Sequence, residues 1–72
     1  MTTIGERIRA ARLRAGRSVH KSALAVGVED RTWYRWEAGD REPGKSELRW
    51  IARVFRVSTD YLLGVEQRGR AA

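Results

Sequence analysis

Apolar residues recur at helical spacing near the N-terminus of this 72-residue chain. Four of them follow one another at intervals of four, three and four positions, as residues on one face of a helix do: Ile4, Ile8, Ala11 and Ala15. Thr3 and Glu6 have the spacing of a capping box, and Gly16 is a typical helix stop. The pattern therefore predicts a first helix over about residues 4–15.

A second, shorter helix is predicted between Ser18, a favourable N-cap residue, and Gly27, which tolerates the left-handed conformation that ends helices. Its inward face consists of Val19, Ala23 and Val26. A third helix should begin near Glu29 or Asp30, because carboxylates suit a helix N-terminus through both capping and the helix dipole.

The third helix has two contrasting faces. Trp33, Trp36 and Glu37 share one face, and Arg31 and Arg35, four residues apart, share the opposite one. We therefore expect the tryptophans to lie in the core and the arginines to point outward.

The remainder of the chain predicts two further helices. The sequence AGDREPGK is a turn-rich loop, and a fourth helix follows over about residues 46–55. Its inward residues are Leu48, Ile51, Ala52 and Phe55. Ser58, Thr59 and Asp60 then cap a last turn that contains Tyr61, Leu62 and Leu63 and ends at Gly64. The expected fold is all-α, with five short helices in one domain over residues 1–65 and a flexible basic tail over residues 66–72.

Length and charge narrow the possible functions. A chain of 72 residues builds one small core, and the absence of cysteine leaves no disulfide or thiolate metal site to support it. The formal net charge is +6, and thirteen of the fifteen basic residues are arginine. Guanidinium groups bind phosphates and guanine edges in a bidentate manner, which favours a polyanionic partner. The simpler alternative is that the arginines only keep a small helical protein soluble. With no leader-like or membrane-spanning segment, we expect a cytoplasmic protein.

The second and third predicted helices have the spacing of a helix-turn-helix, at about residues 18–37. Ala23 is small where the next helix must cross closely, Gly27 permits a positive φ, and Trp33 and Trp36 attach the third helix to the core. The outward face of that helix then remains available.

From Ile4 to Gly64 the chain resembles the phage-repressor-like (XRE/Cro-type) DNA-binding domains, also called lambda-repressor-like. The matching segments are IGERIR, Ser18 with Ala23 and Gly27-Val28, RWE with Gly39, Pro43, and the apolar positions from Leu48 to Leu63. The resemblance implies that a recognition helix over about residues 29–37 enters the major groove, and that a homodimer forms at least on DNA, on a two-fold-related operator. It also implies a structural ion pair between Arg12 and Glu37.

The resemblance further assigns contacts to individual residues. The residues expected to contact base edges are Asp30, Arg31, Thr32 and Arg35. The residues expected to contact phosphates are Ser18, Lys21, Tyr34, Arg41 and Lys45. Because arginine favours guanine O6 and N7 and aspartate accepts from cytosine N4, a half-site that contains G·C pairs is a hypothesis.

This chain departs from the family pattern at several positions. Position 19, commonly a glutamine that contacts DNA, is Val19, and smaller or polar residues replace large apolar ones at Ala11, Arg17 and Ser22. We expect Trp33 to supply the missing volume, because core changes are tolerated best when total volume is conserved. Glu29 and Asp30 place negative charge where phosphates approach, which weakens the case for DNA and penalises wrong sites.

Other residues have competing interpretations. Trp50 and Val54 lie off the inward face of the fourth helix and are either ordinary surface residues or part of a dimer patch. His20 has no obvious second ligand, so the sequence predicts no metal site, no cofactor and no small-molecule ligand. No catalytic constellation is recognisable, and an enzyme is not expected.

The combined observations predict a sequence-specific regulator of transcription that binds double-stranded DNA. With one small domain, repression by occupying an operator, an inverted repeat, is the expected mechanism, and activation through a contact with polymerase stays open. The protein would act in the cytoplasm, on the nucleoid. The alternative is a protein-interaction module with the same fold, such as an antitoxin or adaptor, which reads DNA weakly or not at all.

Overall fold

The computed structural model describes residues 3–65, and this part of the chain folds into five α-helices without a strand. They are α1 (Ile4–Arg14), α2 (Val19–Val26), α3 (Asp30–Ala38), α4 (Lys45–Phe55) and α5 (Thr59–Leu63). The prediction of five helices is confirmed, with helix bounds close to those expected. One detail was wrong: Ala15 is the exposed C-cap of α1 rather than an inward residue, because it lies where the chain turns away. The predicted tail, residues 66–72, lies outside the described residues.

The local signals that define the helices act as expected at three N-termini. Thr3 and Glu6 form the predicted capping box, and the Ser18 and Ser58 side chains accept hydrogen bonds from the first turns of α2 and α5. At the N-terminus of α3 the expectation was wrong in part. Glu29 is the N-cap residue, but its side chain makes no capping hydrogen bond.

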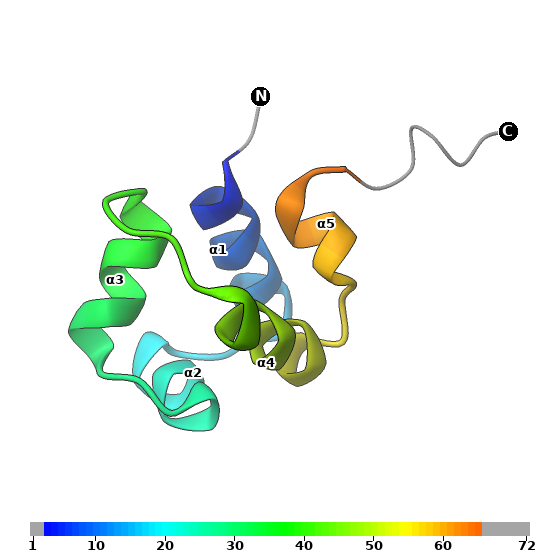
Figure 1. Ribbon diagram of the computed structural model, residues 1–72. Coiled ribbons are helices and arrows are strands. Elements are labelled where there is room, and N and C mark those ends of the chain that lie inside the picture. Colours follow the sequence, from blue (N-terminus) through cyan, green and yellow to red (C-terminus); the bar gives the residue numbers. More distant parts are fainter. Residues whose placement is uncertain (1–2, 66–72) are drawn as a thin grey trace, which may run out of the picture.

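α1 lies between α3 and α5, and α2 and α4 pack below it (Figure 1). α2 contacts both α3 and α4, while α4 also contacts α1 and α5. The turn between α2 and α3 contains Gly27, whose φ of 89° is the left-handed conformation expected of a helix-turn-helix. The short connection leaves the outer side of α3 at the edge of the molecule.

The core is built around two indole rings. Trp33 is fully buried, with its ring centroid 5.4 Å from that of Trp36 and 6.0 Å from that of Phe55. The inward orientation predicted for both tryptophans is confirmed. The other buried apolar residues are Ile8, Ala11, Ala23, Leu48, Ile51, Ala52 and Leu62. Ala11 and Ser22 are buried and small, and Trp33 is fully buried; that its ring compensates for their volume stays a prediction.

α1 and α3 approach each other at Gly5. A Cβ atom on this residue would overlap the carbonyl oxygen of Trp36 and lie 2.9 Å from that of Glu37. Both obstacles are backbone atoms, which cannot rotate away as a side chain can. Only glycine allows α1 to lie this close to the C-terminal end of α3. This contact therefore limits how far α3 can lie from α1.

Candidate nucleic-acid interface

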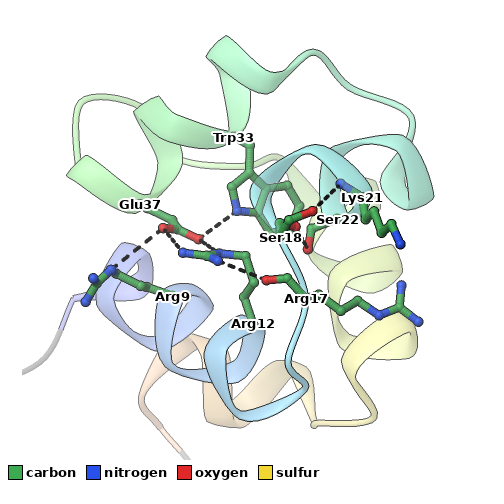
Figure 2. A network of polar contacts seen from close by, with 8 residues as sticks. All are labelled: Arg9, Arg12, Arg17, Ser18, Lys21, Ser22, Trp33 and Glu37. Atoms are coloured by element: carbon green, nitrogen blue, oxygen red, sulfur yellow. Dashed lines mark hydrogen bonds and ion pairs between the residues drawn. The ribbon is translucent and has the colours of Figure 1, made fainter.

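The inner side of α3 is held by a polar network centred on Glu37 (Figure 2). Arg12 donates from Nε to Glu37 Oε2 at 2.6 Å and from Nη2 to Oε1 at 3.2 Å. Trp33 Nε1 donates to the same Oε2 at 2.7 Å, so the indole N–H in the core has a partner. The ion pair that the family resemblance implied is therefore present, and it joins α1 to α3.

Arg12 extends the network to a third segment. Its Nη1 donates to the backbone carbonyl of Arg17 at 3.0 Å, in the connection between α1 and α2. The Arg12 and Glu37 side chains are only 12% and 9% exposed, whereas Arg9, at 4.0 Å from Glu37, is 60% exposed and adds little. The hydrogen bond to Glu37 raises the pKa of Arg12 against the opposing effect of burial, so its charge is permanent. The network thus joins α1 to α3 and to the connection that leads into α2.

The outer side of α3 carries two of the four side chains that were predicted to contact bases. Arg31 and Arg35 are exposed, as is Tyr34 between them. Asp30 and Thr32 are half-buried, which leaves less of Thr32 available than the sequence suggested. Two tryptophans and Glu37 anchor the inner side of α3. The helix therefore presents the guanidinium groups of Arg31 and Arg35 to solvent from a fixed position.

Of the five residues predicted to contact phosphates, Tyr34 is exposed on α3 itself, and the other four lie on segments that flank this helix. Ser18 and Lys21 are exposed at the N-terminus of α2, and Arg41 and Lys45 are exposed between α3 and the start of α4. The Ser18 hydroxyl accepts from the backbone N–H of Lys21 at 3.1 Å, so this side chain also caps α2 (Figure 2). The assignment of these four residues to phosphates stays a prediction.

His20 has a partner that sequence reasoning missed. Its Nδ1 lies 3.0 Å from Oδ1 and 3.2 Å from Oδ2 of Asp30, across the turn that separates α2 from α3. The separation of ten residues crosses a change of direction, and no helical periodicity predicts such a contact. Within residues 3–65, no three His, Asp or Glu side chains are grouped so that they would hold a metal ion.

Trp36 has a second feature besides its burial. Its Nε1 is buried and has no hydrogen-bond acceptor among the described residues. Trp36 also lines a hollow of about 120 Å³ together with Gly5, Gly39 and Arg41. A buried N–H without an acceptor is costly, so burial of this ring contributes less to stability than its area alone would suggest.

The fourth helix carries a separate aromatic surface. Trp50 is half exposed, and the guanidinium of Arg53 stands over its ring at 5.4 Å from the centroid. These two residues line a groove of about 190 Å³ with Ser46 and Arg49. Val54, the other residue proposed for a dimer patch, is half-buried and packs against the core, so Trp50 provides most of the exposed apolar area.

Comparisons with solved structures place this fold among DNA-binding domains. The crystal structure of the P22 c2 repressor in complex with synthetic operator 9T in the presence of Tl⁺ has a TM-score of 0.86 at 30% identity. It covers 92% of this chain and 100% of that one. The solution structure of the DNA-binding domain of the P22 c2 repressor (1–76) has a TM-score of 0.81 at 31% identity, with 85% of this chain and 80% of that chain covered.

Sequence comparisons agree with the structural ones. The HTH-type transcriptional regulator ImmR of Bacillus subtilis (strain 168) is 29% identical over 65 residues, which are 90% of this chain and 51% of ImmR. The chain therefore spans about half the length of this relative. No helix within residues 3–65 is long and apolar enough to cross a membrane. The model of a family described as a helix-turn-helix domain matches residues 3–67, and with the fold above it shows that this chain belongs to that helix-turn-helix family.

Proposed function

We propose that this protein is a sequence-specific regulator of transcription that binds double-stranded DNA and represses by occupying an operator that overlaps a promoter. The observation that carries the proposal is the two-sided character of α3. Its inner side is anchored by Trp33, Trp36 and Glu37, and its outer side exposes Arg31 and Arg35 at the edge of the molecule. The similarity to the P22 c2 repressor, solved on an operator, supports the same use of α3 here. A protein acting in this way works in the cytoplasm, on the nucleoid.

In this proposal α3 lies in the major groove. Arg31 and Arg35 donate to O6 and N7 of guanine, Asp30 accepts from cytosine N4, and Thr32 contacts an adjacent base edge. A half-site that contains G·C pairs is the expected target.

The flanking segments hold the DNA backbone and set the register of α3. Lys21 and Ser18 at α2, Tyr34 at the edge of α3, and Arg41 and Lys45 after it contact phosphates.

Two copies of the chain occupy an inverted repeat in this proposal. A two-fold axis brings the same surface of each copy together, and the exposed Trp50 is the residue that we assign to this contact. Replacing Trp50 by alanine should leave binding to a single half-site unchanged and weaken binding to the full repeat. Equal effects on the half-site and the full repeat would contradict this assignment.

Selection from a pool of random duplexes tests the proposal directly. We expect an enriched inverted repeat whose affinity falls steeply with salt, with a slope of log K against log salt of about −0.9 per phosphate contacted. Arg31→Ala should relax the sequence preference at one base pair, whereas Lys21→Ala should weaken all duplexes alike. Failure to enrich any sequence, or binding that hardly responds to salt, would overturn DNA recognition and favour a protein-interaction module.

A further inference from the structure

Two acidic residues stand at the start of α3, where the proposed function brings DNA closest. Glu29 is exposed and makes no capping hydrogen bond, and Asp30 is half-buried with its carboxylate beside the imidazole of His20. Because His20 comes from α2, this contact joins the two helices of the helix-turn-helix. It lies at the N-terminal end of α3, and the spacing of seven residues places Asp30 about two turns from Glu37 on the same side of the helix.

The chemistry of the contact determines which atom donates. His20 Nδ1 lies 3.0 Å from Oδ1 and 3.2 Å from Oδ2 of Asp30. Because an ionised carboxylate only accepts hydrogen bonds, Nδ1 is the donor in this contact. The nearly equal distances show that the ring nitrogen faces both carboxylate oxygens. The contact thus restricts rotation of the Asp30 side chain about its Cα–Cβ and Cβ–Cγ bonds.

This restriction matters because the Asp30 carboxylate could otherwise turn toward the backbone N–H groups at the start of α3. The first backbone N–H groups of a helix have no intrahelical acceptor, and Glu29 does not satisfy them with its side chain. An unrestrained Asp30 in the first turn of α3 is therefore attracted toward its own helix. The histidine instead holds the carboxylate away from these N–H groups. The Asp30 side chain is 47% exposed there, and its oxygens retain lone pairs for a second donor.

We propose that His20 is a positioning residue that holds the Asp30 carboxylate in the orientation that accepts a hydrogen bond from cytosine N4, and so determines base specificity at one position of the half-site. This inference rests on the proposed DNA-binding function. His20 touches no base itself. Removing the imidazole leaves the Asp30 carboxylate without this hydrogen-bond donor and free to rotate.

The test uses the full chain and the duplex that the wild-type protein enriches from a random pool, together with versions of that duplex in which each base pair is changed in turn. Asp30→Ala identifies the base pair that Asp30 recognises. At that base pair, His20→Ala should lower the preference for the enriched base at least about 5-fold, and preferences elsewhere should stay unchanged. In an Asp30→Ala background, the further change from His20→Ala should be less than about 2-fold.

Two controls separate positioning from a general effect on folding or charge. His20→Asn should restore most of the lost preference, because its amide nitrogen is three bonds from Cα, as Nδ1 is, and also donates to a carboxylate. Lys21→Ala, the neighbouring change on α2, should weaken binding to all duplexes without altering the preference at any base pair. In the free protein, ¹⁵N chemical shifts of the imidazole should indicate an Nδ1–H that changes on Asp30→Ala.

The possible failures are distinguishable. If the wild-type protein enriches no sequence, the proposed function and this inference both fail. If it enriches a repeat but His20→Ala keeps full discrimination at the base pair that Asp30 recognises, only the role of His20 is refuted. The same holds if His20→Ala loses discrimination equally in the Asp30→Ala background, because His20 would then act through another group.

Discussion

Replacing Glu37 by glutamine removes one negative charge from the contact between α1 and α3 and changes the shape of the side chain very little. In the wild-type protein this carboxylate accepts two hydrogen bonds from Arg12 and one from Trp33, and it is 9% exposed. The glutamine oxygen still accepts from Trp33, but its amide group presents N–H donors to a guanidinium that has only donors. Arg12, itself 12% exposed, is left with an unpaired charge.

The structure gives the size of the expected loss. Each hydrogen bond to a charged group contributes roughly 1.5–3 kcal/mol, and part of that gain offsets the cost of removing the carboxylate from water. Breaking a buried pair by removing one partner costs roughly 3–5 kcal/mol. We expect Glu37→Gln to lower the free energy of unfolding by about 3 kcal/mol, which approaches the roughly 3–5 kcal/mol that a core of this size supplies.

Urea unfolding followed by circular dichroism measures the loss, and a second variant tests its cause. Arg12→Leu combined with Glu37→Gln leaves no buried charge and keeps an acceptor for Trp33, so it should recover most of the stability. Glu29→Gln makes the same chemical change at an exposed residue and should alter stability by less than about 0.5 kcal/mol. A Glu37→Gln protein as stable as the Glu29→Gln control, or a double variant no more stable than Glu37→Gln alone, would refute the reasoning.

Four further results are expected. Gly5→Ala should cost about 2–3 kcal/mol, because its Cβ meets backbone carbonyl oxygens that cannot move aside, and thermal unfolding measures this. Trp33→Val should cost about 3 kcal/mol by leaving a cavity, and stability equal to wild type would show that the ring fills no needed volume. Arg56→Gly should raise the free energy of unfolding by about 0.5 kcal/mol, because Arg56 is the C-cap of α4 and has a φ of 57°. A lower free energy of unfolding in urea would contradict this. Because its hydrogen bond to Glu37 raises the pKa of Arg12, its charge stabilises the fold at neutral pH, and alkaline titration should remove that contribution only above the ordinary arginine range.

Local sequence signals specify the helices of this protein and the side of each helix that faces the core. Caps at Thr3, Ser18 and Ser58 and the glycine at position 27 act on neighbouring residues, so their effect is visible in a short stretch of sequence. Helical periodicity likewise separated the buried tryptophans of α3 from its exposed arginines. These properties depend on local hydrogen bonds and on the pitch of a helix.

Contacts between residues of different helices depend on how those helices pack, which local sequence signals do not specify. The distance and angle at which two helices pack determine three features of residues 3–65. They are the close approach at Gly5, the Trp36 N–H without an acceptor, and the contact between His20 and Asp30. Periodicity states which way a side chain points but not what stands opposite it. For this reason the arginines of α3 were predictable as a candidate surface, whereas the histidine that holds Asp30 beside them was not. Packing of the whole core sets that geometry.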